Sequence, residues 1–162
     1  MMNKLAMVVV FAGACTYAHV QSGEVAVIRT PGGVSQTPLQ TGDWKIGGDD
    51  SATIYSTRSQ EREERLEVQA SDGLGIVLDT SIRFHIVATD VVSLDKELGL
   101  DYYGVLVGPT LRSQARRVVG RFKPDEIYSS QRELIERQIR EGVETAIKGR
   151  HIELEAVLIR KV

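Results

Sequence analysis

Asp79 and His85 are the residue pair in this chain that most suggests acid–base catalysis. Both occupy odd positions of a stretch in which apolar residues take the even positions, so both are expected on the exposed face of one strand. Six residues of extended chain separate their Cα atoms by roughly 20 Å, well beyond hydrogen-bond reach. The two residues therefore cannot form a catalytic dyad, and Asp79 is expected to be solvated or to pair with a neighbouring arginine.

The metal-binding and redox residue types are equally sparse. His19, His85 and His151 do not have the spacing of metal ligands, and we expect all three at the surface. The single cysteine, Cys15, can form neither an internal disulfide nor a thiolate zinc site. The sequence accordingly predicts no catalytic residue, no metal and no cofactor.

Cys15 does follow a segment with the order of a secretory signal. Residues 1–4 are short and basic, residues 5–14 carry no charge, and the small residues Ala12, Gly13 and Ala14 lead directly to the cysteine. A helix over residues 5–20 would span only about 24 Å, against roughly 30 Å of bilayer hydrocarbon. A spanning helix is therefore the weaker interpretation of this segment.

The tripeptide before Cys15 resembles the lipobox of bacterial lipoproteins, except that Ala12 stands where that motif usually has Leu. The resemblance implies that Cys15 is acylated, becomes the mature N-terminus and anchors the chain in the bacterial cell envelope. The same residues also satisfy the A-x-A cleavage rule, which would release a soluble protein with a free thiol. An uncleaved short anchor is the third alternative.

Length and composition describe one ordinary globular domain. The chain has 162 residues, of which 42% are hydrophobic and 26% charged, so it can bury a core and is neither disordered nor collagen-like. The 20 basic and 22 acidic residues give a formal net charge of -2. This balance gives no excess of basic residues to neutralise a phosphate backbone, so we expect no nucleic acid partner.

Extended segments dominate the first half of the chain. Residues 23–30 predict a strand that ends in the Pro31-Gly32-Gly33 turn, and residues 52–55 predict a short strand. The period-two alternation over 74–86, from Leu74 to Ile86, predicts a long strand with one buried face. Residues 67–70, joined to it by an Asp-Gly turn, are its expected hairpin partner.

Two amphipathic helices follow. The first, over 111–122, gathers Leu111, Ala115, Val118, Val119 and Phe122 on one face. Its remaining surface is basic, with Arg112, Arg116, Arg117 and Arg121.

The second helix, over 130–148, has an apolar stripe opposite a charged face that includes Arg137 and Arg140. The stripe consists of Ile135, Ile139, Gly142, Val143 and Ala146. Gly149 is expected to end this helix, and residues 152–159 alternate as a final strand, with Ile152, Leu154, Ala156 and Leu158 on one side. The order of strands, helices and strand predicts an α+β fold, an antiparallel sheet with helices packed on it.

The arginines of both helices are the candidate interface or lipid-facing residues. They could meet anionic headgroups or acidic neighbours, although a simply solvated helix face is the alternative.

Six segments together resemble the SPFH (stomatin/prohibitin/flotillin, or band 7) family in its bacterial prohibitin-like form. They are GEVAVI at 23–28, YSTRSQ at 55–60, SDGLGIVLDTSIRFHI at 71–86, YYGVLVGPTLRSQARRVVGRF at 102–122, DEIYSSQRELIERQI at 125–139 and IELEAVLIRKV at 152–162. After the signal segment over 1–14, the resemblance implies a tether over 15–22 and the SPFH domain over 23–162. Family members usually continue past the strand at 152–162 into a long coiled-coil helix, whereas this sequence ends at Val162. It is therefore either a fragment or a member without that helix.

The resemblance also implies a function. Members of the family assemble into large homo- or hetero-oligomeric membrane scaffolds that organise lipid microdomains or associate with membrane-bound ATP-dependent proteases. We therefore expect a non-enzymatic membrane scaffold, whose partners are the membrane, further copies or a related SPFH protein, and a protease of that kind. A soluble periplasmic ligand-binding module or hydrolase is the alternative.

Overall fold

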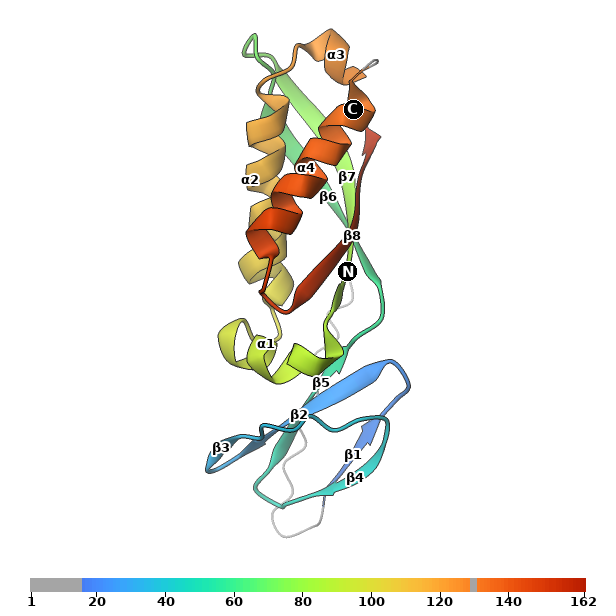
Figure 1. Ribbon diagram of the computed structural model, residues 1–162, viewed down its shortest axis with the longest axis vertical. Coiled ribbons are helices and arrows are strands. Elements are labelled where there is room, and N and C mark those ends of the chain that lie inside the picture. The colour runs from blue at the N-terminus through green and yellow to red at the C-terminus, as the bar shows by residue number, and fades with distance from the viewer. Residues whose placement is uncertain (1–15, 129–130) are drawn as a thin grey trace.

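The computed structural model describes residues 16–128 and 131–162 of the chain (Figure 1). A three-stranded antiparallel sheet with helices on one face forms one end of an elongated molecule, and a group of shorter strands forms the other. The predicted α+β architecture, an antiparallel sheet with helices packed on it, is confirmed.

The larger sheet has the strand order β6-β7-β8. Strand β7 spans Gly75–Ile86, and its even-numbered side chains from Ile76 to Ile86 are buried as the alternation predicts. Leu74 lies outside the strand and is 54% exposed, so its assignment to the buried row was wrong.

The hairpin partner of β7 is much longer than the sequence predicted. Strand β6 spans Gln60–Gln69 and pairs with β7 along its whole length, with Gln69 opposite Gly75 and Gln60 opposite Phe84. The charged residues 61–65 hid the first half of this strand from the sequence analysis. They are tolerated because β6 is an edge strand whose outer side chains reach water.

Strand β8, Ile152–Lys161, closes the sheet on the other side of β7. Its register against β7 shifts between Phe84↔Leu154 and Arg83↔Ala156, which makes Glu155 the extra residue of a bulge. The bulge reverses which positions face the core, so that Val157 and Ile159 are buried while Leu158 is 49% exposed. The prediction of one unbroken alternation from Ile152 to Leu158 was therefore wrong beyond Leu154.

Two helices cover one face of this sheet, with the short α3 (Pro124–Tyr128) between them in sequence (Figure 1). Helix α2 spans Gly108–Val119 and contacts β6, whereas α4 spans Arg132–Ile147 and contacts β8. The predicted apolar faces are confirmed except at the end of α4, where Ile147 is buried and Ala146 is exposed. Helix α4 stops at Ile147, and Gly149 follows in the left-handed region at φ 74°.

The shorter strands form two small sheets. Strands β2 (Glu24–Thr30), β3 (Gly33–Val34) and β5 (Ser51–Ser56) form one, which confirms the predicted strands near 23–30 and 52–55. Strand β1 (Thr16–Val20), within the stretch interpreted as a tether, pairs antiparallel with β4 (Gly42–Ile46) in the other.

Helix α1 (Val91–Glu97) lies between the two ends of the molecule, after the 3-10 turn η1 (Ala88–Asp90) (Figure 1). A π-helical turn, η2 (Tyr103–Val107), then leads into α2. The main core joins β2 and β5 to the larger sheet and the helices, whereas Ala18, Ile28 and Ile46 form a second, smaller cluster.

Candidate interaction surfaces

The basic face predicted for α2 divides into two parts in the structure. Arg112 and Arg116 border a groove against β6, whereas Arg117 and Arg121 border a groove against α4. The division arises because α2 is flanked by different elements on its two sides. Helical spacing places the four arginines outside the core but does not reveal these neighbours.

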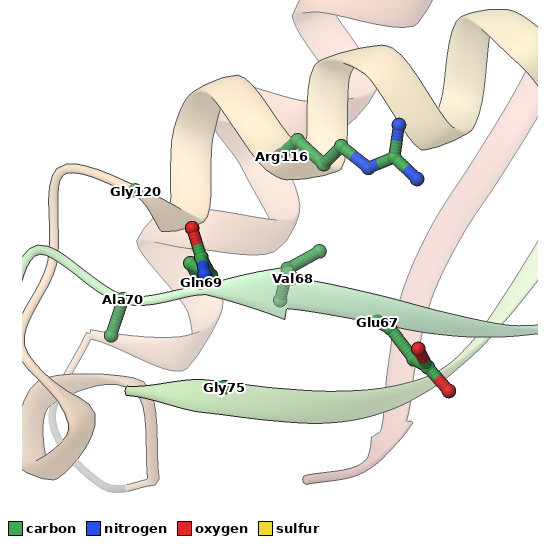
Figure 2. A pocket seen from close by; sticks show the side chains of 7 residues that line it. All are labelled: Glu67, Val68, Gln69, Ala70, Gly75, Arg116 and Gly120. Carbon is green, nitrogen blue, oxygen red and sulfur yellow. The ribbon is translucent and has the colours of Figure 1, made fainter. Parts of the chain in front are cut away.

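The first groove runs between α2 and β6 and has a volume of about 640 Å³ (Figure 2). Its floor is formed by residues 67–70 of β6 and its end, with Gly75 beside them, and its other wall by Arg116 and Gly120. A smaller cavity of about 260 Å³ continues it along Arg65 and Arg112. The groove therefore follows the open edge of β6.

Arg112 is committed to a neighbour within the fold. Its Nη1 donates to both carboxylate oxygens of Glu64, at 3.1 and 2.9 Å, and the hydroxyl of Tyr103 donates to the same carboxylate at 2.9 Å. Burial, together with this hydrogen bond, raises the pKa of Tyr103 above its ordinary value. Arg112 therefore neutralises Glu64 and fixes the start of α2 against β6.

Arg116 and Arg121 are different, because their side chains have no ion-pair or hydrogen-bond partner within residues 16–128 and 131–162. Both residues are exposed. In the part of the chain that the structure describes, these two cations are available to an external anion.

The second groove lies between α2 and α4 and has a volume of about 540 Å³. Arg117 donates to the buried Gln114 at 2.9 Å, and Gln114 in turn lies against Gly142 of α4. A Cβ at position 142 would lie 2.5 Å from the Gln114 side-chain oxygen, so the close approach of the helices uses a glycine.

The predicted charged face of α4 is exposed at Arg137 and Arg140. Arg140 lies 3.9 Å from Glu144, and the Arg137 side chain has no partner in the described ranges. Cys15, the expected site of lipid attachment, lies outside the described residues.

The histidines each lie beside carboxylates. His85 Nδ1 is 2.9 Å from Glu155, His151 Nε2 is 3.3 Å from Glu97, and His19 Nδ1 is 2.5 Å from Asp43. The structure therefore assigns His85 to a pairing across β7 and β8 and not to Asp79. Over residues 16–128 and 131–162 there is no cluster of three or more His, Cys, Asp or Glu suited to a metal ion.

Sequence analysis missed a buried charge at the junction of the two ends of the molecule. The Asp95 side chain in α1 is 0% exposed, and its Oδ1 accepts from Arg29 Nη2 at 2.6 Å and from the Tyr55 hydroxyl at 2.5 Å. Burial and this hydrogen bond raise the pKa of Tyr55. The sequence carries no signal for this site, because Asp95 stands beside the charged Lys96 and Glu97 and its partners are 40 and 66 positions away.

None of the helices that the structure describes is both long and apolar enough to cross a bilayer.

The chain was compared with curated proteins and with models of protein families. No curated protein was found that matches the chain. The family model of the SPFH domain / Band 7 family, in contrast, matches residues 18–162. That match begins inside β1 and includes both small sheets, the larger sheet and its helices. Proteins of the family are generally non-enzymatic scaffolds that associate with membranes and oligomerise. The chain belongs to the SPFH domain / Band 7 family.

Proposed function

We propose that this protein is a non-enzymatic, membrane-anchored scaffold of the prohibitin type. It assembles with copies of itself or with a related SPFH protein, and it organises membrane microdomains or regulates a membrane-bound ATP-dependent protease. The observation that carries the proposal is the family match over nearly the whole chain after the signal-like segment.

The anchor is Cys15, acylated after cleavage of residues 1–14. Acylation at this position supplies membrane affinity of about 0.8 kcal/mol per buried CH₂. Cys15 immediately precedes β1, so an acylated cysteine would hold the sheet of β1 and β4 at the bilayer surface.

The side chains of that small sheet suit such a location. Tyr17 on β1 is 67% exposed, whereas Trp44 on β4 is 40% exposed and lies across from Ala18 on the opposite face of the sheet. Aromatic residues with a polar tip are enriched where a membrane meets water, and lysine side chains such as Lys45, opposite Tyr17, favour anionic headgroups. Tyr17 and Lys45, which share one face of this sheet, support an orientation with that face toward the membrane.

Replacement of the anchoring thiol tests the proposal. The full chain and its Cys15→Ser variant are expressed in a bacterial host, separated into membrane and soluble fractions and analysed by native mass spectrometry from mild detergent. We expect the wild type in the membrane fraction, as an oligomer whose subunit mass begins at an acylated Cys15, and the variant in the soluble fraction.

Ser22→Ala is the matched control, because Ser22 is a nearby exposed residue whose side chain makes no hydrogen bond within the described ranges. It should behave as the wild type does. Membrane retention of Cys15→Ser at the wild-type level would refute the lipid anchor, and a cleaved, unmodified monomer from the wild type would refute both anchor and assembly.

A further inference from the structure

The groove between β6 and α2 has a feature that the scaffold proposal does not use, namely the unpaired backbone edge of β6. Strand β6 is at the end of the strand order, and β7 is its pairing partner. In an antiparallel pair, the N–H and C=O groups of successive residues point alternately toward the partner strand and away from it.

The hairpin turn fixes which residues point outward. The backbone N–H of Ala70 donates to the Leu74 carbonyl at 2.9 Å, so Ala70 faces β7. Alternation from that position turns the backbone groups of Arg65, Glu67 and Gln69 to the open side. Consistent with this, the Gln69 carbonyl oxygen is 3.7 Å from where a Cβ of Gly120 would lie, on the groove side.

These outward backbone groups have no hydrogen-bond partner in the described part of the chain. Their spacing matches that of the backbone groups on a second extended strand. Residues 65, 67 and 69 are separated by two positions each, about 7 Å along the strand. One end of the groove is closed, because the Ser71 N–H donates to the Phe122 carbonyl at 2.9 Å. The other end continues into the cavity beside Arg65 and Arg112.

The charges that border this edge favour an acidic occupant. Arg116 and Arg65 are exposed and have no side-chain partner within residues 16–128 and 131–162. Glu64 is already paired with Arg112 at 2.9 Å. Figure 2 shows the Glu67 carboxylate pointing away from α2, whereas the Arg116 side chain, which lines the groove, runs along α2. Arg65 and Glu67 share the outer face of β6 at the edge of the groove, so their charges offset each other, and Arg116 is the unneutralised cation next to the open backbone groups.

We propose that this groove binds an extended, acidic peptide segment of a partner protein, which adds as a strand to the edge of β6. Backbone groups of residues 65, 67 and 69 supply the strand pairing, and Arg116 binds a carboxylate of the peptide. Affinity in this mode comes from main-chain hydrogen bonds, and specificity comes from the side chains that flank the added strand. A lipid headgroup would use Arg116 but has no row of donors and acceptors to match the strand.

The test uses the full chain purified in mild detergent and a fluorescent peptide, acetyl-Thr-Val-Glu-Val-Thr-amide, with fluorescence polarisation as the readout. A second peptide carries Gln in place of its Glu. Arg116→Glu reverses the charge over the groove, and Arg137→Glu makes the same change at an exposed, unpaired arginine of α4.

Glu67→Pro tests the strand pairing separately from charge. Proline removes the outward N–H of residue 67 while the inward N–H groups of residues 66 and 68, which pair with β7, remain. Should this variant fail to fold by circular dichroism, peptides methylated at alternate backbone nitrogens replace it, because they remove the matching donors from the ligand.

We expect the Glu peptide to bind the wild type, Arg116→Glu and Glu67→Pro each to weaken binding by about tenfold or more, and Arg137→Glu to change it by less than about twofold. The Gln peptide should bind the wild type about tenfold more weakly. Absence of peptide binding, or binding that neither variant weakens, overturns the proposal. Binding of phosphatidylglycerol vesicles that depends on Arg116, without peptide binding, also overturns it and identifies a lipid site.

This inference is independent of the membrane anchor. The Cys15→Ser variant should bind the peptide as the wild type does, whatever its location in the cell. Failure of one proposal is thus distinguishable from failure of the other.

Discussion

Arg29 and Asp95 form an ion pair in which removal of the arginine should destabilise the protein much more than removal of the charge on the aspartate. The two side chains are 2.6 Å apart, yet the Arg29 side chain is 47% exposed and that of Asp95 is 0% exposed. The Asp95 Oδ2 atom has no hydrogen-bond partner in the described ranges. Loss of Arg29 therefore leaves a buried carboxylate, whereas loss of the charge on Asp95 leaves an arginine that water can reach.

The expected magnitudes follow from this asymmetry. In Arg29→Met the carboxylate retains one hydrogen-bond donor, the Tyr55 hydroxyl at 2.5 Å, and breaking a buried pair in this way costs about 3–5 kcal/mol. In Asp95→Asn the Tyr55 hydroxyl still has an acceptor and Arg29 is hydrated, so the cost is about 1–2 kcal/mol. The double variant should be more stable than Arg29→Met alone, because no buried charge is left unpaired.

Urea unfolding followed by circular dichroism at neutral pH measures these differences. With a denaturant slope of about 2 kcal/mol per molar, Arg29→Met should lower the midpoint by about 1.5–2.5 M and Asp95→Asn by about 0.5–1 M. Equal losses in the two single variants, or a larger loss in Asp95→Asn, would refute the argument that burial of the carboxylate decides the energetics.

Three further predictions concern the sheet, the tyrosines and α4. Val157→Ala should cost about 1–2 kcal/mol in unfolding free energy and Leu158→Ala less than about 0.5 kcal/mol, and the reverse order in urea unfolding would contradict the bulge in β8. Because the folded-state pKa values of Tyr55 and Tyr103 are raised above the ordinary value of about 10, their contribution to stability is complete below that pH and is lost as pH rises toward the folded-state values. Ultraviolet titration of tyrosinate should accordingly show two tyrosines ionising later than exposed tyrosines, and uniform ionisation would exclude this account. Arg137→Glu should change the unfolding free energy by less than about 0.5 kcal/mol and leave the oligomer mass unchanged, whereas dissociation in native mass spectrometry would make this face an interface.

Local patterns in the sequence were sufficient for much of the fold. The alternation over 76–86 identified β7 and its buried face, because successive side chains of a strand point to opposite sides. The helical spacing of Leu111, Ala115 and Val118 identified the buried face of α2 for the corresponding reason. Gly149, which adopts positive φ, marked the end of α4. Each of these features depends on residues that are close neighbours in the chain.

Features that depend on distant residues were decided by the tertiary structure. The charged first half of β6 becomes a strand because it pairs with β7, and Leu158 is exposed because a bulge changes the register of β8. The alternation within residues 152–159 carries no sign of that bulge.

The candidate surfaces divide in the same way. Helical spacing identified the four arginines of α2 as lying outside the core, but only the packing of α2 between β6 and α4 pairs Arg112 with Glu64 and leaves Arg116 over an open strand edge. The partners of Asp95 likewise come from β2 and β5. Sequence periodicity reports which side of an element is buried, whereas the neighbours of each side chain are set by contacts between elements far apart in the chain.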